Sequence, residues 1–287
     1  MTDSALLVRT GTETEIAPGV FVFPDRRVNL VPNVGVVLGD DAALVVDTGM
    51  GPASGDVVLS EARRLAGDRR LILTITHFHP EHGFGAARFV DDARIVYNAR
   101  QAAELAENGE EFIELFRTFG PEVAAALEDV VLVQPHETYD GMTELDLGGR
   151  AVTLREQGGA HTAGDQLVLV ADAGVMFTGD LVENRFFPIV FGPADGPAWI
   201  ETLETLRGLD ASIVVPGHGE VAGPELIDAF RAYLVDVRDS VAERAGRGEG
   251  VEQIVAELGP EIRERYASWD NPEWIDFAIR DFHARGA

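Results

Sequence analysis

The residues best suited to chemistry in this chain are histidines that occur in short clusters. Five of the seven histidines fall in three places, each after an apolar, strand-like run and among glycines or prolines. The densest place is the run His77-Phe78-His79-Pro80-Glu81-His82, and the others are Gly159-Ala160-His161 and Gly217-His218-Gly219. Imidazole and carboxylate groups are common ligands of zinc and iron. The histidine clusters therefore predict metal-dependent chemistry.

The spacing within the first cluster indicates two directions of approach to a metal. Side chains repeat every two residues in an extended segment, so His77 and His79 are expected to point to one side and share a metal. Pro80 keeps His79 out of the helical region and turns the chain. Glu81 and His82 then leave the backbone in a different direction, which suits a second metal.

For three further residues, the neighbouring sequence decides whether they are candidate metal ligands. Asp180 follows an apolar run at 174–178 and alone would be interpreted as a turn residue, but the histidine clusters make it a candidate ligand. His136 and His283 are solitary, and a solitary histidine is more often structural than metal-binding. We therefore expect these two histidines to lie outside the site.

The elements that would position these residues alternate between strand-like and helix-like patterns. Strands are expected at 34–38, 42–47, 71–76, 95–97, 151–155, 166–171, 174–178 and 212–215. Helices are expected around Val58, Ala62 and Leu65, with Ser54 or Asp56 as the cap, and at 101–128 and 197–208. This alternation indicates an α/β architecture, in which the carboxyl ends of several strands meet at one rim.

The chain becomes helical from Pro224 to its end. An apolar stripe with helical spacing runs from Leu226 to Val241, and the last stretch is aromatic, with Tyr266, Trp269, Trp274, Phe277 and Phe282. We interpret both as surfaces that pack against the rest of the protein. The expected division is a domain at 1–223 and a helical extension at 224–287 packed on it.

Composition excludes several function classes. The formal net charge is −26, all 23 basic residues are arginines, and cysteine is absent. A surface this negative repels phosphate backbones, so we expect neither nucleic acid nor an anionic membrane as a partner. No thiolate or lysine chemistry is available. The amino-terminal segment lacks the pattern of a secretory signal, and no apolar run approaches the roughly 20 residues of a membrane span, so a cytoplasmic protein is expected.

The ligand-type residues together resemble those of the metallo-β-lactamase superfamily. The resemblance rests on His77-x-His79-x-Glu81-His82, His161, Asp180 and His218 in this order, and on the turn Asp47-Thr48-Gly49. It covers roughly residues 15–222. It implies an αββα four-layer sandwich, here with the carboxy-terminal helical extension.

The resemblance also implies a set of roles for these residues. His77, His79 and His161 would hold the first metal, while Glu81, His82 and His218 would hold the second and Asp180 would bridge the two. The superfamily usually has aspartate where this chain has Glu81, and the extra methylene lengthens the reach of that carboxylate. Zinc is the preferred metal, with iron and manganese as alternatives.

The function implied is a metallo-hydrolase that directs activated water at an ester, thioester, lactone or amide of a small molecule. Glu81 and Asp180 would orient that water and move its proton. Two alternatives stay open. One is an iron-dependent oxygenase, since mono-iron sulfur dioxygenases keep a similar ligand set, and the other is a non-catalytic metal-binding member. A small-molecule substrate is expected as the partner, with a homodimer as an option.

Overall fold

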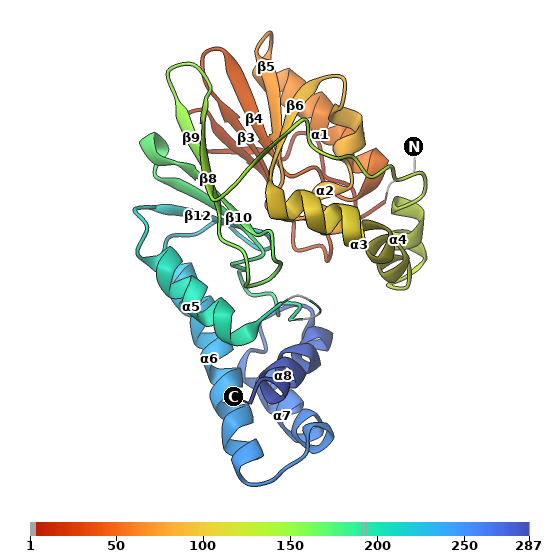
Figure 1. The fold of residues 1–287 in the computed structure, drawn as a ribbon, viewed down its shortest axis with the longest axis vertical. Coiled ribbons are helices and arrows are strands. Elements are labelled where there is room, and N and C mark those ends of the chain that lie inside the picture. The colour runs from red at the N-terminus through yellow and green to blue at the C-terminus, as the bar shows by residue number, and fades with distance from the viewer. Residues whose placement is uncertain (1–3, 191, 193, 287) are drawn as a thin grey trace.

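The structure is a computed structural model that describes residues 4–190, 192 and 194–286. Within these residues the strands form two sheets (Figure 1). The first is seven-stranded, in the order β1-β2-β3-β4-β5-β6-β7, and the second is five-stranded, in the order β12-β11-β10-β9-β8.

The first sheet changes from antiparallel to parallel at β4. β1 to β4 pair antiparallel, whereas β4, β5, β6 and β7 pair parallel, which needs crossover connections between them. Its strands are β1 (Thr14–Ala17), β2 (Val20–Phe23), β3 (Val34–Leu38), β4 (Ala42–Val46), β5 (Arg70–Thr74), β6 (Ala93–Asn98) and β7 (Glu137–Tyr139). The parallel strands therefore place the carboxyl ends of β4, β5 and β6 at one edge.

The second sheet is antiparallel except where β11 pairs parallel with β12. Its strands are β8 (Met142–Asp146), β9 (Ala151–Glu156), β10 (Gln166–Val170), β11 (Val175–Gly179) and β12 (Ile213–Pro216). Because β10 runs against both neighbours, its first residue lies at the same edge as the last residues of β9 and β11. Loops from all these strands therefore meet at one rim.

Alternation along β4 shows how the layers are built. Ala43 and Val45 pack in the cluster beneath the helices of the first sheet. Leu44 and Val46 face the opposite way, into a cluster between the sheets that includes Val168 and Phe177 of the second sheet. Helix, sheet, sheet and helix are therefore stacked in that order, which confirms the predicted αββα sandwich (Figure 1).

The helices over the first sheet differ slightly from the expectation. They are α1 (Gly51–Ala66), α2 (Pro80–Gly83), α3 (Ala99–Arg117) and α4 (Pro121–Ala126), with the short 3₁₀ turn η1 (Ala86–Phe89); a second 3₁₀ turn, η2 (Ala171–Ala173), connects β10 and β11 of the other sheet. The expected cap of α1 at Ser54 or Asp56 is wrong, because the helix begins earlier, at Gly51, without a side-chain cap. Pro52 sits in its first turn, where a missing N–H costs nothing.

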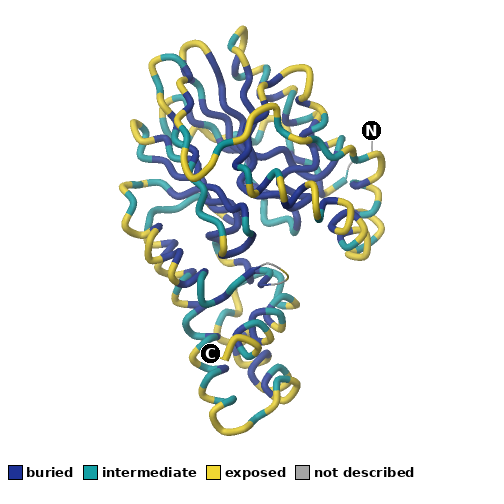
Figure 2. The backbone as a smooth tube through the Cα atoms, viewed as in Figure 1, coloured by how far each residue is buried: buried dark blue, intermediate teal, exposed yellow. Residues whose placement is uncertain are grey.

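The carboxy-terminal region is helical, as predicted. It contains α6 (Glu225–Gly246), α7 (Val251–Arg265), η3 (Pro272–Trp274) and α8 (Ile275–Ala284). The stripe on α6 is buried in one cluster with α5 (Gly196–Arg207) and the outer face of the second sheet, and Phe282 lies in the same cluster. These helices extend from one end of the sandwich, with their inward faces buried (Figure 2).

Four strands were not among the expected elements, namely β1, β2, β7 and β8. All four are three to five residues long. Three of them, β1, β7 and β8, are also largely exposed, so the sequences of these three strands carry a weak apolar pattern.

Among the described residues, no helix is long and apolar enough to cross a bilayer.

Candidate metal centre

The seven predicted ligand residues come from four loops at the rim of the sandwich. The loop after β5 carries His77 and His79, and the short helix α2 that follows carries Glu81 and His82. His79 is extended, with ψ 151°, and Pro80 is the first residue of α2, so the chain turns where the sequence indicated. His161 lies between β9 and β10, Asp180 directly follows β11, and His218 follows β12.

The first group consists of His77, His79 and His161. One ligand atom from each lies within 4.8 Å of the others, and all three side chains are buried. Nε2 of His161 is 3.1 Å from Nδ1 of His79. Three ring nitrogens that converge in this way form a suitable face for one cation.

The second group consists of Glu81, His82, Asp180 and His218. Their ligand atoms also lie within 4.8 Å of one another, and all four residues are buried. The group combines two imidazoles with two carboxylates, a mixture that zinc, iron and manganese accept. The structure therefore brings all seven predicted residues into two adjacent groups.

Asp180 lies between the two groups. Its Oδ1 is 3.1 Å from Nε2 of His82 and 3.7 Å from Nε2 of His218. Its Oδ2 is 3.8 Å from Nε2 of His77 and 3.7 Å from Nε2 of His161. Each oxygen of this one carboxylate thus faces a different group, which is the arrangement that a bridging ligand requires.

The polar atoms at the centre of the site lack hydrogen-bond partners within the described chain. Nε2 of His77, Nε2 of His82, Oε2 of Glu81 and Oδ1 of Asp180 are all buried and form no aligned hydrogen bond. A buried polar atom without a partner destabilises the folded protein, so such atoms normally have one. Their convergence fits divalent cations as the missing partners.

In two of the histidines, His82 and His218, the ring nitrogen that points away from the site, Nδ1, has a hydrogen-bond acceptor. Nδ1 of His82 lies 2.9 Å from Oδ2 of Asp47, and Nδ1 of His218 lies 3.0 Å from the carbonyl oxygen of Val31. A carboxylate or carbonyl oxygen can only accept, so Nδ1 donates in both cases and Nε2 faces the site. Such contacts fix the ring orientation and raise the basicity of a metal ligand.

Asp47 is itself held tightly. Its backbone has φ 67°, in the left-handed region, and its Oδ1 accepts the N–H of Thr76 at 2.7 Å. Asp47 thereby ties the loop after β4 to the loop that carries His77. The sequence had shown this residue only as part of the Asp47-Thr48-Gly49 turn.

Asp165 was missed by the sequence reasoning. Its carboxylate accepts the backbone N–H of His161 at 2.8 Å and of Thr162 at 2.9 and 3.0 Å, and the Thr162 hydroxyl at 2.6 Å. It therefore holds the His161 loop in shape. The signal that identifies it is an aspartate three residues after a threonine in a glycine-containing loop, a pattern typical of local side-chain-to-backbone bonding.

Burial determines the protonation of the first group. It lowers the pKa of His77 and His79 well below the ordinary value, and it lowers the pKa of His161 to about 4. Neutral imidazole is the form that binds metals. These three histidines are therefore ready to act as ligands at neutral pH.

The second group has opposing influences. Burial raises the pKa of Glu81 to about 7, although His82 opposes the shift. For His82, burial lowers the pKa, but the carboxylates of Asp180 and Asp47 prevail and raise it. For Asp180, burial raises the pKa, but the neighbouring imidazoles outweigh this effect and the net pKa is lowered. These imidazoles belong to His82, His218 and His77. A cation entering this group must displace the protons held here.

The two solitary histidines, His136 and His283, lie outside both groups, as expected. His136 is exposed and accepts the N–H of Ile95 through Nδ1, and His283 is part of α8. Arg185 forms a half-exposed ion pair with Glu220 at 2.9 Å. In the loop that follows Asp180, Phe186 approaches His218 with 5.6 Å between ring centroids, whereas Phe191 lies outside the described residues.

Comparison with known proteins agrees with this geometry. The sequence profile of the Metallo-beta-lactamase superfamily matches residues 27–218. The chain is 22% identical over 274 residues to the linear primary-alkylsulfatase of Pseudomonas sp. (strain ATCC 19151), covering 79% of this chain and 52% of that protein. It is 26% identical over 122 residues to the metallo-beta-lactamase type 2 of Bacteroides fragilis, covering 41% of this chain and 49% of that protein. The chain thus spans about half the length of these curated relatives.

Solved structures show the same fold. A metallo-beta-lactamase from Pontibacter korlensis superposes with a TM-score of 0.64 at 20% identity, over 78% of this chain and 98% of that one. The inverting sec-alkylsulfatase Pisa1 from Pseudomonas sp. superposes with a TM-score of 0.73 at 12% identity, over 95% of this chain and 50% of that one. Because the family profile matches most of the sandwich and spans all seven ligand-type residues, the chain belongs to the metallo-beta-lactamase superfamily.

Proposed function

We propose that this protein is a two-metal hydrolase that cleaves an ester, thioester, lactone or amide bond of a small molecule. The observation that supports this proposal best is the position of Asp180, whose two oxygens face two separate groups of ligand-type side chains. His77, His79 and His161 would hold one cation, and Glu81, His82 and His218 would hold the other, with Asp180 shared. We propose zinc for both, since imidazole nitrogen and carboxylate oxygen are ordinary zinc ligands, with iron and manganese as alternatives that accept the same donors.

Divalent cations in the two groups would lower the pKa of water and polarise the bond to be cleaved. The chain itself supplies orientation and proton acceptance. Asp180 reaches both groups through separate oxygens, so it can accept a hydrogen bond from a water molecule between them. Glu81 is buried with Oε2 unpartnered, so its carboxylate can hold a proton taken from that water.

Sulfate esters are a second candidate substrate class. The alkylsulfatase structure matches 95% of this chain, whereas the Pontibacter metallo-beta-lactamase matches 78%. The similarity to the alkylsulfatase thus extends over more of the chain, including part of its helical region. We therefore propose that sulfate esters be tested beside carboxylic esters.

The test begins with metal content and a substrate panel. Purified protein is assayed for metal per chain and for hydrolysis of 4-nitrophenyl acetate, a phenyl thioester, a chromogenic lactone, nitrocefin and 4-nitrophenyl sulfate. We expect one to two ions per chain and hydrolysis of at least one compound. A strong chelator should remove the ions and abolish the hydrolysis. His161→Ala should abolish hydrolysis, and His283→Ala on α8 serves as the matched control.

The same measurements separate the alternatives. An iron-dependent oxygenase would contain iron and consume dioxygen with a thiol or persulfide substrate while leaving the panel intact. A non-catalytic member would bind metal without turnover of any compound. Less than roughly a tenth of an ion per chain after metal-replete expression would contradict all three.

A further inference from the structure

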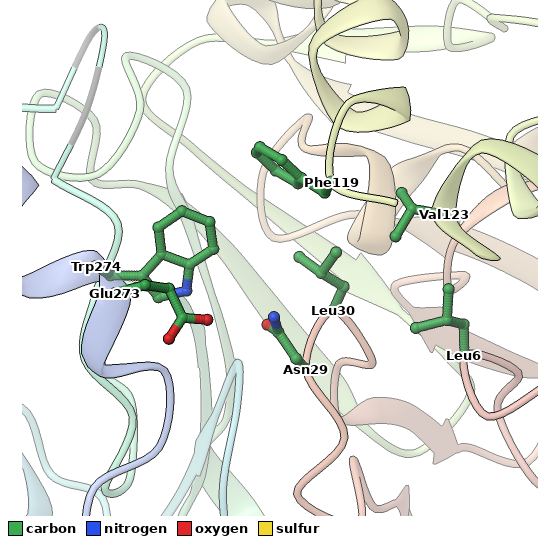
Figure 3. Close-up of a pocket in the computed structure, with 7 residues that line it drawn as sticks. All are labelled: Leu6, Asn29, Leu30, Phe119, Val123, Glu273 and Trp274. Atoms are coloured by element: carbon green, nitrogen blue, oxygen red, sulfur yellow. The ribbon is translucent and has the colours of Figure 1, made fainter. Parts of the chain in front are cut away.

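A cavity lies where the carboxy-terminal helical region meets the sandwich (Figure 3). Its volume is about 240 Å³. Leu30 from the amino-terminal part of the chain forms one side together with Phe119, which follows α3, and Val123 of α4, while Glu273 and Trp274 of η3 form the other side. The cavity therefore exists only because segments far apart in the sequence come together.

The lining of this cavity is mainly apolar. Leu30 and Val123 are buried, and the rings of Phe119 and Trp274 lie 5.6 Å apart at an angle of 59°. Glu273 is the single charged residue among the described residues that line it. An apolar cavity of roughly 150 Å³ is enough to hold benzene. This larger cavity suits an uncharged alkyl or aryl group.

Two chains of contacts connect the cavity to the metal centre. The ring of Phe119 is 4.9 Å from that of Phe116, which in turn is 6.3 Å from the ring of His79 in the first group. On the other side, Leu30 precedes Val31, whose carbonyl oxygen accepts from His218 in the second group. Two residues of the cavity wall, Phe119 and Leu30, are thus each next to a residue, Phe116 or Val31, that contacts one histidine of a metal group.

The wall formed by η3 is anchored to the sandwich. Arg27 forms an ion pair with Asp270 at 2.6 Å, and Nδ2 of Asn271 donates to Oδ1 of Asn29 at 3.1 Å. Both contacts lie within four residues of Trp274. The indole is therefore held at a defined place opposite Phe119 rather than on a freely moving tail.

We propose that this cavity binds the uncharged alkyl or aryl part of the substrate while its scissile bond lies at the metal centre. Phe119 and Trp274 are then specificity-determining residues, and the helical region contributes directly to substrate choice. This inference rests on the proposed hydrolase function, because it is that reaction which places a scissile bond beside His79 and His218.

The first arm of the test measures kcat/KM for 4-nitrophenyl acetate, butyrate and hexanoate with the metal-loaded full chain. We expect kcat/KM to rise by about fourfold for each methylene until the cavity is filled. Val123→Phe fills the cavity and should remove most of this gain, so the hexanoate value, with four more methylenes than acetate, should fall by about 10²-fold while the acetate value stays nearly unchanged. Trp274→Ala should raise KM for the hexanoate without lowering kcat for the acetate. Met142→Ala, an exposed apolar residue on β8 outside the cavity, is the matched control.

The second arm does not depend on hydrolysis. The probe is 4-nitrotoluene, which is uncharged, cannot be hydrolysed and quenches indole fluorescence at short range. It should quench the fluorescence of the unmodified protein saturably, and Val123→Phe, which keeps Trp274, should abolish the saturable component. Phe119→Ala, at a residue 37% exposed and therefore tolerant of truncation, should weaken it. Melting temperatures verify that each variant is folded.

The two arms distinguish the possible failures. If esters are hydrolysed and Val123→Phe keeps the chain-length dependence, the cavity does not bind the substrate and the inference is wrong. If no compound in the panel is hydrolysed, the proposed function fails, and 4-nitrotoluene alone decides on the cavity. If 4-nitrotoluene then quenches the unmodified protein and Val123→Phe equally, the cavity is not a binding site for apolar groups.

Discussion

Asp47 lies directly behind His82, with its Oδ2 2.9 Å from Nδ1 of the imidazole, on the side of the ring opposite to the site. The other ring nitrogen of His82, Nε2, is 3.1 Å from Asp180. One carboxylate thus orients the ring and another faces the position of the metal. Both carboxylates are buried, so neither is screened by water.

Asp47→Asn should weaken metal binding in the second group by about 10- to 100-fold, the usual effect of losing such a supporting contact. Asparagine tolerates the left-handed backbone at this position, so the fold should persist. Its amide nitrogen cannot accept from His82. Metal titration with a competing chelator measures the effect, with Asp91→Asn at the exposed loop before β6 as the control. Unchanged affinities in both groups would contradict the role of Asp47.

Glu81→Ala should leave one metal bound through His77, His79 and His161 while the second site loses its ion. kcat should then fall by about 10²-fold or more, the usual scale for a lost proton acceptor. Glu81→Asp should be milder, because it keeps a carboxylate at this position. Metal per chain and kcat are measured for both variants. If both keep the stoichiometry of the unmodified protein and nearly the same kcat, Glu81 is not a ligand.

Asp165→Ala should destabilise the His161 loop, because it leaves the N–H groups of His161 and Thr162 buried without an acceptor. Each unpaired donor costs about 1–3 kcal/mol, so the free energy of unfolding should fall by at least that amount. Asp165→Asn keeps one acceptor oxygen and should lose less. Urea unfolding of the metal-free protein measures both variants. A change below about 0.5 kcal/mol for the alanine variant would show that the loop does not depend on Asp165.

Metal affinity of the second group should fall as the pH falls. In the metal-free protein, burial raises the pKa of Glu81 to about 7, and the Asp180 and Asp47 carboxylates raise that of His82 despite its burial. A cation competes with those protons, so below about pH 7 the affinity should drop by about tenfold per pH unit for each proton displaced. Burial instead lowers the pKa values of His77 and His79, so the first group should be less sensitive. Zinc titrations at pH 6, 7 and 8 measure the difference, and two equal pH slopes would contradict it.

Truncation after residue 223 should lower the melting temperature and the solubility of the protein. It removes Phe230 and Leu234, which share one buried cluster with Trp199 and Met176 of the sandwich. The apolar surface that becomes exposed would then favour association of the truncated chains. Thermal unfolding and size-exclusion chromatography test this expectation. A truncated protein with the same melting temperature and elution volume would show that the sandwich does not need the helical region.

Local patterns in the sequence were sufficient to predict an α/β architecture and the ligand candidates, whereas the αββα sandwich was implied by the resemblance to the metallo-β-lactamase superfamily. The continuous apolar runs of β4 and β5 are typical of strands that are buried on both faces of a sheet, so they could be recognised without knowing which strands lie beside them. His77, His79 and Glu81 lie within a few residues of one another, so backbone geometry alone relates their side chains. The short exposed strands β7 and β8 were missed because pairing with neighbours, rather than their own apolar pattern, holds them in place.

Tertiary packing decided the contacts that join distant segments. Asp47 meets His82 across 35 residues, Val31 meets His218 across 187, and Phe119 meets Trp274 only after the helical region docks. No local spacing encodes such pairs, because the distance between two loops depends on how the sheets and helices stack between them. The sequence by itself therefore determined which residue types were available for chemistry, and the fold decided which of them face one another across the site and what closes the cavity beside it.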